Sequence, residues 1–272
     1  MSETIIHPTA IVDKQVTMGR GVHIGPGCVI TGQVSLGDDV RLLPNVHLFG
    51  PVKIGARTML YPGSCVGFPP QDFKFTPGSL TAGVVIGEDC ILREHATVHA
   101  ATNPDVPTRI GNRVFMMVSS HVGHDCTIGN NVILANSSLV AGHCQIFDNV
   151  MMSGNTAMHQ FARIGRLGFL SGNTGIARDL PPFCVCAERN IIKTINFVGM
   201  RRAGIDRTLI TLTRKCFTDV FCKMMPRQEM IRELEVRAKD CPLILEQAEF
   251  IATSKRGICL GREANAHHND IE

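Results

Sequence analysis

One hexapeptide near the middle of the chain carries several groups that can transfer protons. It reads His121-Val122-Gly123-His124-Asp125-Cys126. A neutral imidazole can accept a proton from a hydroxyl group near neutral pH. A carboxylate beside it, here Asp125, can hold such a ring in one orientation. The residue types therefore indicate general-base chemistry, provided that the fold directs both side chains toward one reacting atom.

A repeat with a period of six residues predicts where these side chains lie. An aliphatic residue or Met stands at every sixth position from Ile6 to Val66, from Ile86 to Val98 and from Ile110 to Ile176. The fourth residue after each is usually small, and a glycine often follows directly. This hexapeptide pattern predicts a parallel β-helix of triangular coils, each of about 18 residues. We expect glycine or another turn-tolerant residue to take the corners where φ is positive.

Residues 18 apart in such a coil stack above one another, about 4.8 Å apart per coil. The column that starts at His124 continues with Gly142 and Gln160, and the one that starts at Asp125 continues with His143. Both columns are expected to face outward. A backbone N–H beside a glycine can approach a tetrahedral oxyanion. Solvated polar side chains on a β-helix face would explain the same residues without any chemistry.

The composition narrows the classes of function. The chain has 272 residues and a net charge of +3, which is too small to indicate a nucleic-acid partner. Its 11 cysteines come without an evident signal peptide, so a cytoplasmic location with free thiols is expected. No apolar run is long enough for a transmembrane segment. The cysteines lack zinc-ligand spacing, so we expect no metal, and no Ser or Cys nucleophile is paired with a histidine, which favours direct transfer over a covalent intermediate.

The repeat also predicts the domain organisation. Residues 1–189 form the β-helix, with loops inserted at 68–84 and 99–109 where the period breaks. After the Pro181-Pro182 pair the pattern becomes helical, and residues 190–257 are expected to form an α-helical cap domain. Asp206 and Pro226 are expected helix starts within it. The polar segment 258–272 is expected to be a disordered tail.

Four motifs, in order along the chain, carry a more specific resemblance. They lie at residues 70–75 (PQDFKF), 121–126 (HVGHDC), 139–143 (LVAGH) and 158–161 (MHQF). In this combination the chain resembles the bacterial UDP-N-acetylglucosamine 3-O-acyltransferases, which perform the first step of lipid A synthesis. The resemblance extends from the N-terminal Ile-His-Pro-Thr-Ala through residues 199–204 and the helical region, which is nearly the whole chain.

The resemblance implies a mainly β protein, a left-handed parallel β-helix with a C-terminal α-helical domain. It implies a homotrimer with three sites at the subunit interfaces and no cofactor. The expected donor is an (R)-3-hydroxyacyl chain on acyl carrier protein. The expected acceptor is the 3-hydroxyl of UDP-N-acetylglucosamine.

The resemblance also assigns roles to residues of this chain. His124 would be the general base, Asp125 its orienting partner and Gly142 the oxyanion donor. Other residues would position the sugar nucleotide or the acyl chain: Asp72, Lys74, His121, His143, His159, Gln160, Asn196, Arg201 and Arg202. Phe169 and Gly172 lie where the family's acyl-length ruler sits.

Two departures from the family pattern keep alternatives open. The segment Glu188-Arg189-Asn190-Ile191 stands where the family usually has Gly-Asn-x-Ala, and Val198 stands where an acidic residue is expected. A divergent paralogue that acts on a 3-amino sugar nucleotide is one alternative. A zinc enzyme of the γ-carbonic-anhydrase type, built on the same coil, is a second. A non-catalytic scaffold is a third.

Overall fold

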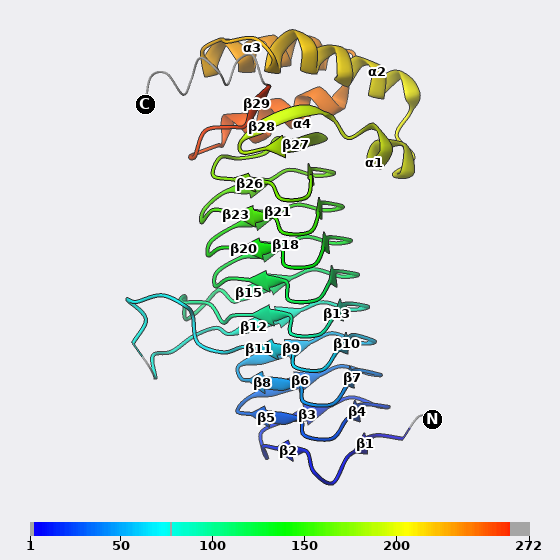
Figure 1. Ribbon diagram of the computed structural model, residues 1–272, viewed down its shortest axis with the longest axis vertical. Coiled ribbons are helices and arrows are strands. Elements are labelled where there is room, and N and C mark those ends of the chain that lie inside the picture. Colours follow the sequence, from blue (N-terminus) through cyan, green and yellow to red (C-terminus); the bar gives the residue numbers. More distant parts are fainter. Residues whose placement is uncertain (1–2, 77, 262–272) are drawn as a thin grey trace.

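The body of the molecule is a stack of triangular coils (Figure 1). The structure, a computed structural model, describes residues 3–76 and 78–261. In this part of the chain the strands form three sheets, which we name A, B and C. Sheet A contains β1 (Ile5–Ile6), β4 (His23–Ile24), β7 (Arg41–Leu42), β10 (Met59–Leu60), β13 (Ile91–Leu92), β16 (Phe115–Met116), β19 (Ile133–Leu134), β22 (Met151–Met152), β25 (Phe169–Leu170), β27 (Cys184–Glu188), β28 (Ile191–Ile195) and β29 (Leu260–Gly261).

The other two sheets consist of parallel strands throughout. Sheet B contains β2 (Ile11–Val12), β5 (Val29–Thr31), β8 (His47–Phe49), β11 (Cys65–Val66), β14 (Thr97–Val98), β17 (His121–Val122), β20 (Leu139–Val140), β23 (Ala157–Met158) and β26 (Gly175–Ile176). Sheet C contains β3 (Thr17–Met18), β6 (Val34–Leu36), β9 (Val52–Ile54), β12 (Val84–Ile86), β15 (Thr108–Ile110), β18 (Thr127–Ile128), β21 (Gln145–Ile146) and β24 (Arg163–Ile164).

The six-residue period translates directly into register. His121 pairs with Leu139, and Val122 pairs with Val140, which is the 18-residue step expected of one coil. The second residue of each short strand points inward, so Val122, Ile128 and Leu134 are at most 2% exposed. Each coil buries these aliphatic side chains against the next. The parallel β-helix predicted from the period is confirmed.

The corners with positive φ are taken by glycine or by another turn-tolerant residue, as expected, with glycine at Gly21 (φ 65°), Gly27 (φ 67°) and Gly63 (φ 72°). The glycine that directly follows an inward aliphatic residue is at a different position. Except at Gly67 its φ is not positive, and the left-handed residue comes two positions later, as at Asp125 (φ 58°) and Asn131 (φ 55°). The glycine is needed because the coils approach closely there. A Cβ on Gly111 would lie 2.6 Å from the carbonyl carbon of Gly129 in the next coil. Asp and Asn tolerate the left-handed position better than most residues do.

Both insertions leave the body at the same corner. The first runs between β11 and β12 and the second between β14 and β15, so each connects sheet B to sheet C. They lengthen the coil without breaking the stack: Met59 pairs with Ile91, 32 residues on, and Ile91 pairs with Phe115, 24 residues on. In Figure 1 the first insertion is the long cyan loop that projects from the side of the stack. We call this edge of the triangle the B–C corner.

Helices cover the C-terminal end of the stack (Figure 1). The antiparallel pair β27–β28 extends sheet A. It is followed by α1 (Phe197–Arg202), α2 (Arg207–Cys216), the π-helical turn η1 (Phe217–Phe221), α3 (Arg227–Ala238) and α4 (Pro242–Ala252). Asp206 caps α2 by accepting a hydrogen bond of 2.7 Å from the Thr208 N–H, as predicted. The described residues contain no helix that could cross a membrane.

The expectation of disorder is wrong for the first part of the tail. Residues Leu260 and Gly261 form β29 and pair with β28, while Ile258 bridges Asp179. Because their backbone groups are paired with strands of the body, these residues are ordered together with it. The rest of that tail, residues 262–272, lies outside the described residues.

An arginine pair fastens the helices to the last coils. Arg163 contacts Asp179 at 2.9 Å, donates to the Phe250 carbonyl of α4 at 2.8 Å and lies over the Phe250 ring. The Asp179 side chain is 1% exposed. Arg166 pairs with Glu246 of α4 at 2.7 Å. The position of the helical region relative to the coils is therefore fixed by charge-assisted contacts as well as by apolar packing.

Candidate active site

The candidate site lies on the B–C corner. Three consecutive turns there join β17 to β18, β20 to β21 and β23 to β24, and they contain residues 123–126, 141–144 and 159–162. The predicted columns are present: the N–H of His143 donates to the His124 carbonyl, and the N–H of Phe161 donates to the Gly142 carbonyl. The turns thus stack one above another and bring residues 18 apart into contact.

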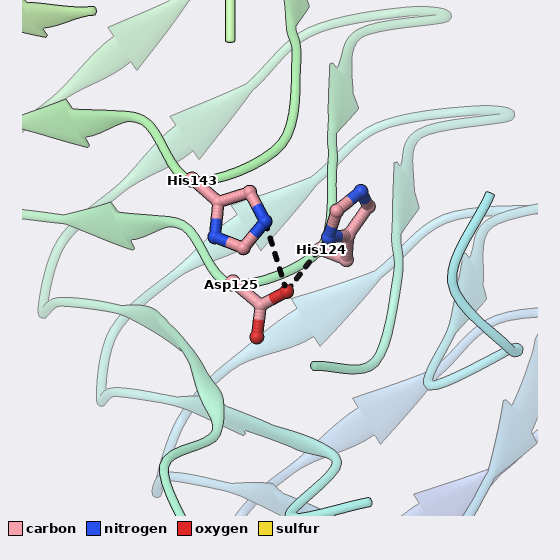
Figure 2. Close-up of side chains that lie close together, drawn as sticks. All are labelled: His124, Asp125 and His143. Carbon is pink, nitrogen blue, oxygen red and sulfur yellow. Dashed lines mark hydrogen bonds and ion pairs between the residues drawn. The ribbon is translucent and has the colours of Figure 1, made fainter. Parts of the chain in front are cut away.

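His124 and Asp125 form an oriented pair (Figure 2). Nδ1 of His124 lies 2.7 Å from Oδ2 of Asp125. The two side chains are only 12% and 10% exposed, so the pair is more enclosed than the outward position predicted. An ionised carboxylate can only accept, so Nδ1 carries the proton and Nε2 keeps a free lone pair. That is the tautomer a general base needs.

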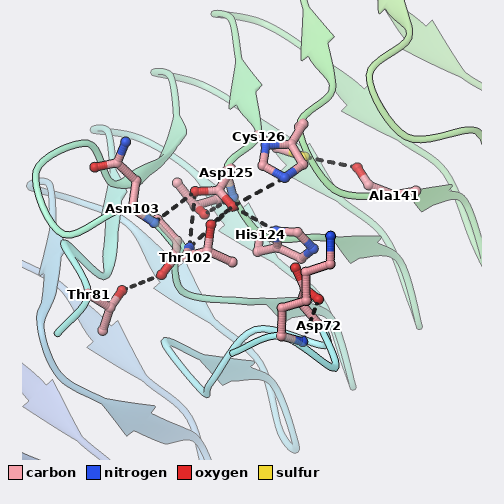
Figure 3. A network of polar contacts seen from close by, with 12 residues as sticks. Asp72, Thr81, Thr102, Asn103, His124, Asp125, Cys126 and Ala141 are labelled. Carbon is pink, nitrogen blue, oxygen red and sulfur yellow. Dashed lines mark hydrogen bonds and ion pairs between the residues drawn. The ribbon is translucent and has the colours of Figure 1, made fainter. Parts of the chain in front are cut away.

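The second insertion holds the Asp125 carboxylate (Figure 3). The Thr102 hydroxyl donates to Oδ2 at 2.7 Å, and the Thr102 N–H donates to Oδ1 at 3.0 Å. The Asn103 N–H adds a longer contact of 3.3 Å to Oδ1. From the other side, the Asp125 N–H donates to the Thr108 hydroxyl at 2.8 Å. The loop therefore fixes both the side chain and the backbone of Asp125.

These contacts determine the charge of Asp125. Burial opposes ionisation, but the hydrogen bonds from His124 and Thr102 outweigh it and lower the pKa of the carboxyl to about 2. Asp125 is thus a permanent anion under physiological conditions. Ligand atoms of His124, Asp125 and His143 lie within 4.8 Å of one another, which a metal ion could use. Because donors already occupy the carboxylate, the arrangement suits an orienting role better than a ligand role.

Gly142 provides the space in front of His124. A Cβ at this position would lie 2.6 Å from Nε2 of His124, so no other residue fits beside the ring. At the neighbouring C–A corner, the corresponding Asn130 N–H donates to Asp148 of the next coil. Among the described residues, the Gly142 N–H has no such acceptor. The Gly142 backbone and the imidazole lone pair of His124 therefore border the same space.

His143 completes the upper wall of this space. Its ring is perpendicular to that of His124 at a centroid distance of 5.0 Å, and it stacks on Phe161 at 4.6 Å. Its Nε2 lies 3.7 Å from Oδ2 of Asp125, as Figure 2 shows. The Phe161 ring on one face and the carboxylate at one edge fix the direction of the other ring nitrogen, Nδ1.

His121 precedes the pair on β17 and is neutral at pH 7. Burial, together with the nearby His99 and His124, lowers the pKa of His121 to about 4. The Thr97 hydroxyl contacts its Nδ1 at 2.7 Å, and the His99 ring meets it edge-on at 5.1 Å. Burial also lowers the pKa of His99, whose Nδ1 is buried without a partner among the described residues. His121 and His99 thus add two uncharged imidazoles next to the pair.

The first insertion is tied to the second. The Ala82 N–H donates to the Asn103 carbonyl, and the Thr81 hydroxyl donates to the Ala101 carbonyl. This loop carries Asp72, which accepts a hydrogen bond of 2.9 Å from the Lys74 N–H in a local turn. Figure 3 draws Asp72 in the same close-up as His124. The two insertions therefore form one support beside the catalytic candidates.

Comparisons with known proteins agree with this geometry. A family model described as UDP-N-acetylglucosamine O-acyltransferase, domain 2, matches residues 179–259, and a bacterial transferase hexapeptide model matches residues 107–142. A relative from Sulfurihydrogenibium sp. (strain YO3AOP1), named acyl-[acyl-carrier-protein]–UDP-N-acetylglucosamine O-acyltransferase, is 51% identical over 93% of this chain and 93% of its own. One of the same name from Thermodesulfovibrio yellowstonii is 37% identical over 93% of this chain and 98% of its own.

The chain belongs to the UDP-N-acetylglucosamine O-acyltransferase family. The resemblance inferred from the four motifs is thereby confirmed. The solved structure of the Francisella novicida UDP-N-acetylglucosamine acyltransferase superposes with a TM-score of 0.91 at 28% identity, covering 96% of each chain. The β-helix and its helical end are therefore both features of this O-acyltransferase family.

A second group of residues expected in the O-acyltransferase site lies elsewhere in the subunit. A pocket of about 540 Å³ opens over sheet A and α1, and Phe169, Asn196 and Arg202 help to line it. None of the histidines of the B–C corner lines this pocket. Asn196 caps α1 by accepting from the Gly199 N–H at 2.9 Å and donates to the Leu167 carbonyl at 2.8 Å, so it has a structural task. Arg201 and Gly172 do not line the pocket.

The remaining expected residues lie at the B–C corner one coil above Gly142. His159 and Gln160 are exposed, and Nδ1 of His159 lies 3.1 Å from the Gln160 carbonyl oxygen. One subunit of this O-acyltransferase family member therefore assembles His121, His124, Asp125, Gly142 and His143, with His159 and Gln160 one coil above. The residues that line the sheet A pocket stay apart from them.

Sequence reasoning missed the residues that support the site. Thr97 pairs with His121 across a 24-residue step. A column of residues 18 apart therefore does not include Thr97 or His99. Thr102 and Asn103 lie in the insertion, where no period applies. The break in the period close to the histidines was the one signal that this loop lies at the site.

Proposed function

We propose that this protein transfers an (R)-3-hydroxyacyl chain from acyl carrier protein to the 3-hydroxyl of UDP-N-acetylglucosamine, in the synthesis of lipid A. Its membership of the family and the names of its relatives support the reaction class and the substrates. One observation supports the mechanism most strongly. The Nδ1–H of His124 is bound to an ionised Asp125, which leaves Nε2 as a base beside the Gly142 backbone.

In the proposed reaction Nε2 of His124 removes the proton of the sugar 3-hydroxyl as its oxygen attacks the thioester carbonyl. The C–O bond forms and the carbonyl oxygen becomes an oxyanion, which the Gly142 N–H binds. When the tetrahedral intermediate collapses, the C–S bond breaks. The proton held on His124 then passes to the departing thiolate of the carrier. Asp125 stabilises the imidazolium between these two steps.

Attack by the sugar itself is favoured over a covalent acyl-enzyme. The thiol nearest in sequence to the base is Cys126, which is fully buried and donates to the Ala141 carbonyl at 3.1 Å. Its contact with Cys144 and its burial both raise its pKa well above the ordinary value. A buried, protonated thiol is a poor nucleophile. The ester therefore forms in a single transfer between two bound substrates.

We also propose a homotrimer in which the B–C corner of one subunit meets sheet A and α1 of the next. This arrangement would explain why the expected residues fall into two groups. Phe169, Asn196 and Arg202 would then extend the groove that starts at His124, so that the acyl chain and nucleotide span both subunits. Sedimentation or light scattering measures the oligomeric state directly.

The test of the function is an acyl-transfer assay with a panel of 3-hydroxyacyl carrier proteins. Purified wild type is expected to acylate UDP-N-acetylglucosamine, and His124→Ala is expected to lower kcat at least a hundredfold. His7→Ala, at an exposed position outside the strands, is the matched control. Equal activity of wild type and His124→Ala would overturn the role of the base.

The same assay separates the alternatives. Transfer only to a 3-amino sugar nucleotide would replace the acceptor but keep the mechanism. Stoichiometric zinc together with hydration of carbon dioxide would instead indicate a zinc site with His124, Asp125 and His143 as ligands. A folded trimer with neither activity would be a scaffold.

A further inference from the structure

The C-terminal segment that follows α4 returns to the B–C corner. Arg256, within this segment, places Nη2 3.3 Å from Nδ1 of His159, although 97 residues separate the two in sequence. Its Nε donates to the Ala177 carbonyl at 3.2 Å. The guanidinium therefore bridges two successive coils immediately above the turn that carries Gly142.

The backbone around Arg256 is anchored at several points. Gly257 has a φ of 70°, which permits the sharp turn. The Ser254 hydroxyl donates to the Gly257 carbonyl, and the Asp179 N–H donates to the same oxygen at 2.9 Å. The Cys259 N–H in turn donates to the Asp179 carbonyl at 2.8 Å. Arg256 is thus held on a short, fixed turn rather than on a free end.

Two contacts compete for Nδ1 of His159, and they require opposite tautomers. A guanidinium has only donors, so its contact requires an unprotonated Nδ1. The contact of 3.1 Å with the Gln160 carbonyl oxygen requires a proton on Nδ1. The approach of the positively charged donor disfavours an N–H at Nδ1. A neutral ring with its proton on Nε2 satisfies the contact with Arg256.

We propose that Arg256 is a positioning residue that fixes His159 as an Nε2–H donor toward the sugar nucleotide. The inference rests on the proposed function, since the substrate is the one assigned above. It predicts that the loss of Arg256 weakens binding of the sugar nucleotide and leaves the chemistry at His124 intact. Arg256 acts through His159 and does not itself contact the reacting atoms.

The first measurement is the ¹⁵N spectrum of the His159 side chain in histidine-labelled full-length protein, with His159→Gln used for assignment. In the wild type Nδ1 is expected to be pyridine-like and Nε2 pyrrole-like. In Arg256→Ala the proton is expected to move to Nδ1, where the Gln160 carbonyl accepts it. Lys255→Ala, which removes a neighbouring exposed charge on the same turn, is expected to leave the wild-type pattern.

The second measurement is steady-state kinetics. Arg256→Ala is expected to raise KM for the sugar nucleotide about tenfold while kcat stays within twofold. Arg256→Lys, which keeps a donor, and added guanidinium with Arg256→Ala are each expected to recover part of the loss. In a His159→Ala background the same substitution is expected to have no further effect, because its target is gone.

The outcomes separate the inference from the function. Unchanged His159 resonances and an unchanged KM in Arg256→Ala would overturn the inference, whatever the activity of the wild type. An equal effect in the presence and absence of His159 would also overturn it. If the wild type has no transferase activity but Arg256→Ala still shows the tautomer shift, the proposed substrate is wrong. The contact between Arg256 and His159 is then still supported.

Discussion

The hydroxyl of Thr102 donates a hydrogen bond of 2.7 Å to Oδ2 of Asp125, from an inserted loop 23 residues earlier in the chain. The same oxygen receives Nδ1 of His124. The loop that interrupts the repeat is therefore part of the catalytic support. A regular six-residue turn at this place would leave the carboxylate without these donors.

Thr102→Val tests this support. The isosteric change removes one charge-assisted hydrogen bond, of the kind that contributes about 1.5–3 kcal/mol, while the backbone N–H donors remain. We expect kcat to fall about tenfold with KM unchanged, and Thr102→Ser to stay near wild type. Thr127→Val, on an exposed position of β18, is the control. Full activity of Thr102→Val in steady-state assays would show that the backbone donors suffice.

Gly142→Ala tests the space beside the base. The added methyl group would lie 2.6 Å from Nε2 and Cε1 of His124, so the ring must turn away from its productive position. The backbone φ of Gly142 is not in the left-handed region, so the fold should tolerate alanine. We expect kcat to fall at least a hundredfold with little change in Tm. The control is Gly154→Ala, whose new Cβ would meet only the Asn136 carbonyl at 3.5 Å.

The low pKa of His121 predicts an acid-dependent loss of stability. The folded protein keeps this ring neutral down to a pH of about 4, whereas the unfolded chain takes up a proton near pH 6.5. The unfolded state therefore binds more protons in this window, and stability falls as the pH drops from about 6.5 to about 4. One such group changes the free energy of unfolding by at most about 1.4 kcal/mol per pH unit.

Chemical denaturation at fixed protein concentration, repeated between pH 4 and 7.5, measures this slope. His121→Asn is expected to reduce it by up to one proton, and His7→Asn, at an exposed position, is expected to leave it unchanged. A wild-type slope that His121→Asn does not alter would assign the acid sensitivity to other groups, of which His99 is the nearest.

Arg163→Met tests the attachment of the helices. It would leave the Asp179 carboxylate, 1% exposed, without its cationic partner, which typically costs about 3–5 kcal/mol. Arg166→Met breaks a pair whose side chains are about one-third exposed and should cost about 1 kcal/mol or less. We expect a much larger fall in Tm for Arg163→Met, together with faster hydrogen exchange in α4. Equal effects would mean that apolar packing alone holds the helices.

The parts of this structure that depend on the six-residue period can be predicted from the sequence. The six-residue period predicts that Val122 points inward, and the 18-residue column predicts that Gly142 lies beside His124. It predicts nothing within the insertions, so Thr102 could not be placed on Asp125. Nor does it indicate that Arg256 reaches His159, because that contact depends on the path of the chain through four helices.

The left-handed conformation at Asp125 illustrates a second limit. Aspartate is acceptable there for its backbone as well as for its carboxylate, so its presence in the turn does not by itself indicate chemistry. Asn131 and Asn149 fill equivalent left-handed positions at the C–A corner of the triangle. Only the donors gathered around the Asp125 carboxylate distinguish it from them.

The constant height of the coils gives the molecule a scale with fixed divisions. The turn that carries His124 and the strands that carry the helical end belong to one stack. Each coil adds one division of about 4.8 Å, whether it has 18 residues or, at the step from Phe169 to Val185, 16. Adding or removing a whole coil between them would change the reach of the surface by one division and leave both ends intact. Length in this fold therefore changes in steps, and a groove along it would distinguish extended ligands by increments of about four carbon–carbon bonds.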